Sequence, residues 1–171
     1  TVQGVLNGDA KRGSGIFKST DSGATCNQLA STNVTNFQYV MKIAVSPRNV
    51  QRIYAATRTG IFRSIDGGGT WTAVVAAGDT NGCTDLALQV NRASGYIFAS
   101  CGTVFTPAAS TVAGIYRALD SNTTTFTKVF TVSGYGRTSL ALAPSNESYL
   151  YAMVSDNNTG TYQYGLKGVY R

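Results

Sequence analysis

The chain has 171 residues, with 14 Lys and Arg against 8 Asp and Glu and no His, which gives a formal net charge of +6. The basic residues are dispersed, with Lys11-Arg12 as the only doublet, so no nucleic-acid-binding surface is expected. No apolar stretch approaches the roughly 20 residues that a membrane-spanning helix needs, so no membrane span is expected.

The predicted elements are short strands separated by polar turns. Nineteen Gly, ten Tyr and abundant Thr, Ser, Asn and Val favour strands and turns, and no long stretch has apolar residues at helical spacing. Pairs of strands joined by a polar turn recur over residues 42–55, 85–99 and 139–152. Each pair is followed by a third strand, a tight turn and a fourth strand, so the repeated unit has four strands.

The third strand and its tight turn form the clearest repeat. Residues 15–26 align without a gap with residues 60–71, which read Gly-Ile-Phe-Arg-Ser-Ile-Asp-Gly-Gly-Gly-Thr-Trp. A third copy over 114–126 has an aspartate at the same place and an aromatic residue one position late. A fourth copy begins at 168–171. Four strands recurring every 40 to 55 residues or so is the spacing of propeller blades.

We therefore expect an all-β fold made of propeller blades of four antiparallel strands. The end of one blade is expected over 1–36, whole blades over 37–76 and 77–132, and an incomplete blade over 133–171. Closed propellers need about four to eight blades, so a partial propeller of about three to four blades would leave apolar faces open. We expect the remaining blades to come from a longer chain; a cleaved companion chain or a symmetry mate are the alternatives.

The tight turn resembles the Asp-box of the bacterial neuraminidase repeat, whose pattern is Ser-x-Asp-x-Gly-x-Thr-Trp. Residues 64–71 match it at every defined position, and residues 19–26 match except that Cys26 stands at the Trp position. The chain thus resembles sialidase-like, sortilin-like and xyloglucanase-like propellers, which include enzymes, receptors and assembly factors. The resemblance implies a secreted or cell-surface protein, and these box residues: Ser19, Asp21, Gly23, Thr25, Ser64, Asp66, Gly68, Thr70, Trp71, Asp120, Thr124 and Phe126.

The box residues are expected to be structural. A carboxylate at the mouth of the turn accepts hydrogen bonds from backbone N–H groups, Gly adopts a positive φ, and the Thr hydroxyl closes the loop. The Trp or Phe is expected to pack between blades. Catalytic carboxylates must converge across a cleft, whereas Asp21, Asp66 and Asp120 would repeat around a ring, so none is assigned a catalytic role.

An enzyme would therefore need other groups. The remaining acids are Asp9, Asp79, Asp85, Glu147 and Asp156, and a glycosidase would need two of them face to face, which their spacing does not require. A sialidase-like site would need an arginine cluster, and the available arginines include Arg48, Arg52, Arg58, Arg92 and Arg137. The family's N-terminal arginine motif is not seen. No catalytic residue and no cofactor is expected.

The cysteines indicate one disulfide. Pairing Val90 with Tyr96 across the turn at 91–95 brings Cys83 and Cys101 nearly opposite each other, and a disulfide needs Cβ atoms about 4 Å apart. The alternative is two small buried apolar residues. Cys26 is expected to fill the Trp position as a core residue. Three dispersed Cys without His predict no metal site.

Two loops are longer than the repeat requires, over 102–112 and 155–165. Both join the second strand of a blade to the third, so they are expected on one side of the propeller. Phe105, Tyr162 and Tyr164 are candidates for stacking on sugar rings or gripping a protein; alternatively they cover their own blade. The sequence favours a non-catalytic binding or assembly module for protein or glycan. The alternatives are a glycoside hydrolase, sialidase-like or xyloglucanase-like, and a structural component of a cell-surface layer or filament.

Overall fold

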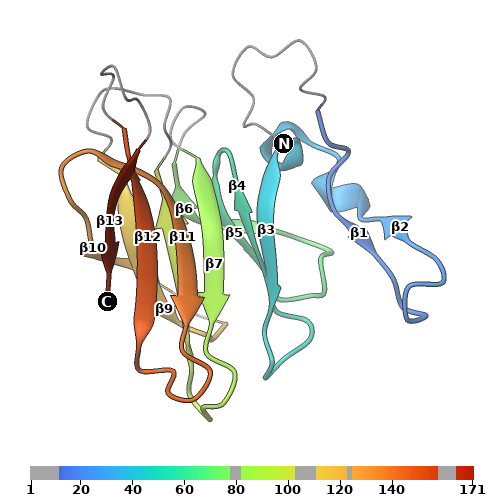
Figure 1. Cartoon of the computed structure of the whole chain (residues 1–171). Helices are drawn as coiled ribbons and strands as arrows, with labels where there is room; N and C mark the ends of the chain where they lie inside the picture. Colours follow the sequence, from blue (N-terminus) through green and yellow to red (C-terminus); the bar gives the residue numbers. More distant parts are fainter. Residues whose placement is uncertain (1–11, 78–81, 103–110, 123–124, 158–164) are drawn as a thin grey trace.

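The computed structural model describes residues 12–77, 82–102, 111–122, 125–157 and 165–171 (Figure 1). In these residues the regular structure is β-strand apart from two single-turn 3-10 helices. This confirms the all-β prediction.

The chain folds into successive antiparallel sheets. The N-terminal sheet pairs β1 (Phe17–Lys18) with β2 (Asn27–Gln28), and it is followed by the 3-10 helices η1 (Ala30–Thr32) and η2 (Thr35–Phe37). The three larger sheets follow in chain order. The first sheet contains β3 (Val40–Val45), β4 (Ile53–Thr57), β5 (Gly60–Ser64) and β6 (Thr72–Ala76); the second contains β7 (Cys83–Leu88), β8 (Tyr96–Cys101), β9 (Gly114–Leu119) and β10 (Thr127–Phe130); the third contains β11 (Tyr135–Leu142), β12 (Leu150–Asp156) and β13 (Leu166–Tyr170).

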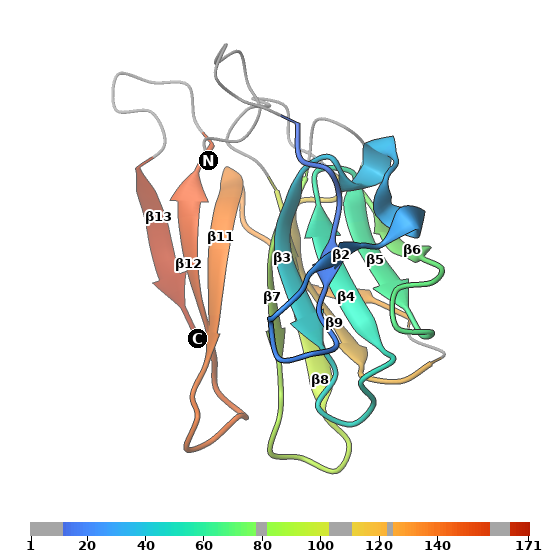
Figure 2. The same cartoon turned by 90° about the vertical axis from the view of Figure 1, so that its right-hand side faces the viewer.

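The strands are ordered within each sheet as they follow in the chain, so every neighbour is joined by a hairpin connection. The first strands of the three larger sheets, β3, β7 and β11, lie next to one another, and the sheets are stacked face against face (Figures 1 and 2). The carboxylate of Asp85 on β7 accepts a hydrogen bond from the backbone N–H of Leu140 on β11 at 2.8 Å. The side chain of Asp85 therefore joins β7 to β11 directly.

Stacking gives a separate core at each junction between sheets. Alternate residues of a strand point to opposite faces, so each central sheet contributes one set of side chains to each neighbour. The core between the first and second sheets contains Tyr54, Ala56, Ile61, Leu86, Ile97, Ala99 and Tyr116. The core between the second and third sheets contains Ala113, Ile115, Tyr135, Ala152 and Val154. The core between the N-terminal segment and the first sheet contains Ile16, Phe37, Ala55 and Phe62.

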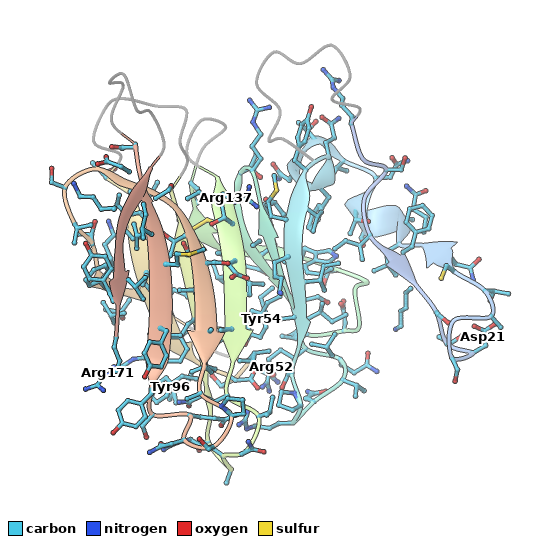
Figure 3. The ribbon with its side chains drawn as sticks, in the orientation of Figure 1. Asp21, Arg52, Tyr54, Tyr96, Arg137 and Arg171 are labelled. Atoms are coloured by element: carbon cyan, nitrogen blue, oxygen red, sulfur yellow. A yellow bond between two sulfur atoms is a disulfide. The ribbon has the colours of Figure 1, made fainter. Side chains whose placement is uncertain are left out.

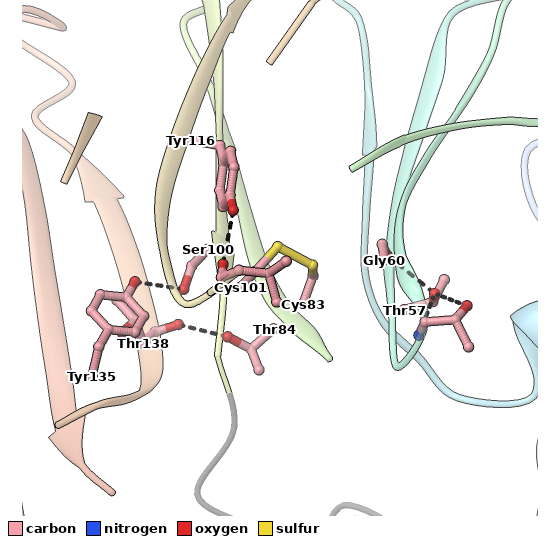
Figure 4. Close-up of a disulfide and its surroundings, with 11 residues drawn as sticks. Thr57, Gly60, Cys83, Thr84, Ser100, Cys101, Tyr116, Tyr135 and Thr138 are labelled. Atoms are coloured by element: carbon pink, nitrogen blue, oxygen red, sulfur yellow. Dashed lines mark hydrogen bonds between the residues drawn. A yellow bond between two sulfur atoms is a disulfide. The ribbon is translucent and has the colours of Figure 1, made fainter. Parts of the chain in front are cut away.

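The predicted disulfide is present and joins β7 to β8 (Figure 4). Cys83 and Cys101 are register partners with Cα atoms 3.8 Å apart, and both are fully buried. The hydroxyl of Thr84 donates to the carbonyl of Thr138 at 3.1 Å, so the region around the disulfide is also tied to the third sheet.

The prediction that Cys26 fills a core position was wrong. The residue is exposed, and its thiol is free. The described part of the N-terminal sheet has two short strands, whose residues are all exposed, so no second layer covers the position that Trp71 has in the next repeat.

Candidate functional site

The tight turn after β5 is closed by the side chains of Ser64, Asp66 and Thr70. The Ser64 hydroxyl donates to Asp66 Oδ1 at 2.7 Å and accepts from the N–H of Gly68 at 2.8 Å. The N–H of Thr70 donates to Asp66 Oδ1 at 2.9 Å, and its hydroxyl donates to Asp66 Oδ2 at 2.7 Å. Both carboxylate oxygens are thus used inside the turn.

The turn after β1 has the same pattern. Ser19 Oγ donates to Asp21 Oδ1 at 2.7 Å and accepts from the N–H of Gly23 at 2.8 Å. Thr25 donates to the two oxygens of Asp21 at 2.9 Å through its N–H and at 2.6 Å through its hydroxyl. Two segments that align in sequence therefore form the same closed turn.

These hydrogen bonds favour the charged form of each carboxylate. The Thr25 hydroxyl, followed by the Thr25 N–H and Ser19, lowers the pKa of Asp21 from 3.8 to about 2. The Thr70 hydroxyl, with the Thr70 N–H and Ser64, lowers the pKa of Asp66 still further below its usual range. A carboxylate held in this way stays charged and does not act as a proton donor near neutral pH.

Asp120, the aspartate of the third repeat, joins two sheets. Its carboxylate has no exposed surface and accepts from Ser46 at 2.5 Å, Arg48 at 3.1 Å, Arg52 at 2.8 Å and Tyr54 at 3.0 Å. Burial raises its pKa, but the hydrogen bonds from Arg52 and Ser46 and the charge of Arg52 more than offset this, and the net pKa is lowered.

The aromatic residues of the turns also pack between layers. Trp71 lies with its ring centroid 5.1 Å from that of Phe37, at the junction with the N-terminal segment. Phe126 lies edge-on to Tyr54, with ring centroids 6.4 Å apart, at the junction of the first and second sheets. Thr124, the remaining predicted box residue, lies outside the described residues.

The other described acids also have structural partners. Glu147 is buried and accepts from the N–H groups of Val90 at 2.7 Å and Asn91 at 3.0 Å, so it joins the β11–β12 turn to the β7–β8 turn. Asp85 joins β7 to β11, as described above, and Asp156 lies 3.5 Å from Lys167. Asp9 and Asp79 lie outside the described residues.

Of the five arginines considered for a cluster, three lie at the end of the sheets that carries the tight turns. Arg48 and Arg52 bind Asp120, and Arg48 also donates to the carbonyl of Gln89 at 2.9 Å. Arg92 donates to Ser148 at 2.5 Å. Arg137 lies toward the other end of the molecule (Figure 3). The structure therefore does not gather the five arginines at one place.

A pocket lies at the end of the sheets opposite the tight turns. It has a volume of about 170 Å³ and is lined by Arg12, Thr35, Gln38, Tyr39, Arg58 and Thr59. The guanidinium of Arg58 lies over the ring of Tyr39, with its carbon 5.4 Å from the centroid.

Hydrogen bonds between main-chain groups tie the walls of this pocket together. The N–H of Arg58 donates to the carbonyl of Tyr39 at 3.0 Å, and the N–H of Gly13 donates to the carbonyl of Gln38 at 2.9 Å. The walls come from three segments that are distant in sequence. In the sequence, Arg58 is only one of several arginines, because no local pattern indicates that residues 35–39 lie beside it.

The residues predicted to bind a ligand, Phe105, Tyr162 and Tyr164, lie outside the described residues. Among the residues that the structure describes, no group of three His, Cys, Asp or Glu could hold a metal ion. No helix in the described ranges is both long and apolar enough to cross a membrane.

Comparison with protein-family models and with curated proteins gives no match. Among solved structures, an ancestral GH74 enzyme has a similar fold, with a TM-score of 0.51 and 16% sequence identity. The match covers 95% of this chain and 23% of the enzyme chain, so this chain spans less than a quarter of that neighbour's length. At this identity the similarity shows the fold alone. The successive four-stranded antiparallel sheets are accordingly the blades of a partial β-propeller.

Proposed function

We propose that the chain is a section of a secreted β-propeller that serves as a non-catalytic binding module for glycan or protein. The observation that carries this proposal is the state of the described carboxylates. Asp21 and Asp66 close their own turns, Asp120 joins two blades, and Glu147 binds a neighbouring turn. Glycoside hydrolysis needs two carboxylates that face each other across a cleft, and these residues serve the fold instead.

The pocket beside η2 supports a binding role. Two arginines, a tyrosine and three polar side chains surround a space of about 170 Å³. This is smaller than the roughly 300 Å³ at which pockets for drug-sized ligands begin, so the pocket would take only a small part of a ligand, such as one sugar ring or one side chain of a partner protein. Guanidinium groups and hydroxyls provide directed hydrogen bonds to hydroxyl and carboxylate oxygens. The end of the propeller that carries this pocket also contains the described ends of the two lengthened loops, at Gly102, Asp156 and Gly165.

The two closed turns support their assignment as Asp-boxes. Both use the same three side chains in the same hydrogen-bond pattern, as expected from the resemblance to the bacterial neuraminidase repeat. The disulfide between Cys83 and Cys101 suits an oxidising compartment and so supports secretion.

A glycoside hydrolase is the second candidate, because the structural neighbour is a GH74 enzyme. In that case the catalytic carboxylates would be Asp9, Asp79 or groups supplied by other blades. A structural component of a cell-surface layer or filament is the third candidate.

Binding and hydrolysis should be measured on the same samples. A panel of neutral and uronate-containing oligosaccharides is titrated by calorimetry, and the mixtures are then assayed for new reducing ends. We expect binding without new reducing ends, and weaker binding by the Arg58→Ala variant. The matched control is Arg117→Ala, which removes an exposed arginine from β9 that stacks on Tyr96. If new reducing ends still appear after the protein has been purified further, the glycoside hydrolase would be favoured.

A further inference from the structure

We infer that one end of the second and third sheets, the end that carries the β7–β8 and β11–β12 turns, is a binding surface for an acidic polysaccharide. This surface, called the arginine surface below, consists of Arg92, Arg117, Arg171, Tyr96 and Tyr149. Tyr96 and Arg171 both lie at the lower end of the molecule in Figure 3. The pocket lies at the opposite end of the sheets, so the inference does not depend on the ligand of the pocket.

The arginine surface repeats one pairing on two successive sheets. On the second sheet, the guanidinium carbon of Arg117 lies 4.7 Å from the ring centroid of Tyr96. On the third sheet, the guanidinium carbon of Arg171 lies 5.1 Å from the ring centroid of Tyr149. The two pairs are equivalent, because each tyrosine directly precedes the residue that pairs with the end of the first strand, and each arginine follows the Gly-x-Tyr of the repeat.

Buried polar groups hold the two pairs beside each other. The side chain of Gln89 accepts a hydrogen bond from the N–H of Tyr96 at 2.9 Å, and it donates one to the carbonyl of Glu147 in the β11–β12 turn at 2.6 Å. Arg92 also reaches from one turn to the other, because its guanidinium donates to the hydroxyl of Ser148 at 2.5 Å. The arginines and tyrosines of the two sheets therefore belong to one surface.

The exposed charge of the arginine surface is positive. Arg92, Arg117 and Arg171 are all exposed. The described acids at this end of the same two sheets are Asp120 and Glu147, and both are buried, with exposed fractions of 8% and 7%. Among the ion pairs between described residues, none includes any of these three arginines. Charge complementarity therefore favours an anionic ligand.

The chemistry of the arginines indicates a polymer. A guanidinium that stacks on a ring uses its face, whereas its N–H groups lie in its plane and match the paired oxygens of an anionic group. An exposed ion pair contributes little by itself, so a ligand has to reach several arginines at once. A chain of repeating acidic units does this, since Arg117 and Arg171 occupy equivalent places on successive sheets.

Among such polymers, an acidic polysaccharide fits best. The apolar faces of sugar rings pack on tyrosine rings, and Tyr149 is 42% exposed. The disulfide suits an oxidising compartment, and outside cells the abundant anionic polymers are carboxylated and sulfated polysaccharides. The basic residues of the chain do not form the runs that are typical of nucleic-acid-binding proteins.

The length of the ligand separates the arginine surface from the pocket. A short oligosaccharide that contacts one exposed arginine gains little from it, so Arg117→Ala remains a suitable control for short ligands of the pocket. A polymer that extends across both sheets contacts all three arginines.

The experiment measures binding to immobilised dextran sulfate and polygalacturonate by biolayer interferometry, with uncharged dextran as the reference. We expect binding to the sulfated and the carboxylated polymer and none to dextran. The variant Arg92→Ala/Arg117→Ala/Arg171→Ala should bind about tenfold more weakly, because three exposed ion pairs are lost. Arg171→Ala alone, which removes one stacked pair and no buried group, should bind about twofold more weakly.

The matched control is Arg12→Ala/Arg58→Ala/Arg137→Ala. This variant removes the same charge from the other end of the molecule and includes both arginines of the pocket. It should bind the acidic polymers nearly as tightly as the original chain. Thermal unfolding of each variant verifies that it is folded.

Four outcomes would overturn the inference. The first is no binding to either acidic polymer. The second is equal weakening in the two triple variants, since net charge alone would then govern binding. The third is weakening in the control variant alone, which would place the acidic polymer in the pocket. The fourth is tighter binding to oligothymidylate or to phosphatidylglycerol vesicles than to both polysaccharides, which would favour a nucleic acid or a lipid surface.

Discussion

Arg52 and Asp120 form a hydrogen-bonded ion pair between two blades, with Nη1 and Oδ1 2.8 Å apart and the carboxylate fully buried. Arg52 lies at the start of the second strand of one blade, and Asp120 follows the third strand of the next. Arg48 adds a second cation at 3.1 Å, and Tyr54 adds a neutral donor at 3.0 Å. The carboxylate of Asp120 thus links two blades.

Replacement of this carboxylate should be among the most destabilising polar changes. Asp120→Asn keeps the shape but leaves Arg52 and Arg48 without their anion, and breaking a buried pair in this way costs about 3 kcal/mol. Urea unfolding followed by fluorescence measures the loss. The control is Asp156→Asn, whose partner Lys167 is 30% exposed, and which should change stability by less than about 1 kcal/mol. Similar effects of both changes would contradict the role of Asp120.

Acid should weaken the fold through the closed turns. The pKa of Asp21 is lowered in the folded chain from 3.8 to about 2, and that of Asp66 is lowered further. A carboxylate whose pKa is lower in the folded chain than in the unfolded chain contributes to stability. This contribution is complete above the unfolded pKa of 3.8 and is lost as the pH falls through the folded pKa. Thermal unfolding temperatures should therefore fall between pH 4 and pH 2.

The Asp66→Asn variant tests the source of this acid sensitivity. The variant should unfold at a lower temperature than the original chain at pH 7, and the difference should shrink on acidification toward pH 2. Asp156→Asn again serves as the control for loss of a single charge. If the difference in unfolding temperature between the variant and the original chain stays the same across this pH range, the hydrogen bonds of Asp66 do not depend on its charge.

Reduction of the disulfide should destabilise the chain without altering its exposed thiol. Cys83 and Cys101 are separated by 18 residues, and a crosslink over a loop of this size contributes about 3 kcal/mol. Thermal unfolding with and without dithiothreitol measures the effect. The Cys83→Ala/Cys101→Ala variant should be insensitive to dithiothreitol. Before reduction, a native thiol assay should detect Cys26 alone, since it is the free cysteine and is exposed.

One turn residue offers a stabilising change. Ser22 has a φ of 57°, whereas the equivalent residue of the next repeat is Gly67, with a φ of 72°. A side chain in this left-handed region is strained, so Ser22→Gly should raise stability by about 0.5 to 1 kcal/mol. The reverse change, Gly67→Ser, should be destabilising, because a Cβ there would also meet the side chain of Gln51. If Ser22→Gly lowers stability, the serine side chain stabilises the turn by more than its strained backbone costs.

Several features could be predicted from sequence because they depend on neighbouring residues. The turn at 91–95 sets the pairing of Cys83 with Cys101, and the closed turns place Ser64 and Thr70 within reach of Asp66. Other predictions failed or were incomplete where distant segments meet. Cys26 is exposed because burial at its position depends on the packing of another layer. The binding roles of Phe105, Tyr162 and Tyr164 stay predictions.

By itself, the sequence determined the hairpins, the closed turns, the disulfide and the repeat of four strands, because turn chemistry and alternating side chains act over a few residues. Only the tertiary structure decided that Asp120 binds Arg52, that Arg58 and Tyr39 share a pocket wall, and that Tyr151 and Met153 are exposed while Tyr54 is buried. These relationships depend on how whole sheets stack. Stacking is governed by the sum of many contacts between residues that are distant in the sequence, such as Arg48 with Gln89 and Arg52 with Asp120, which are 41 and 68 positions apart, and no local pattern records that sum.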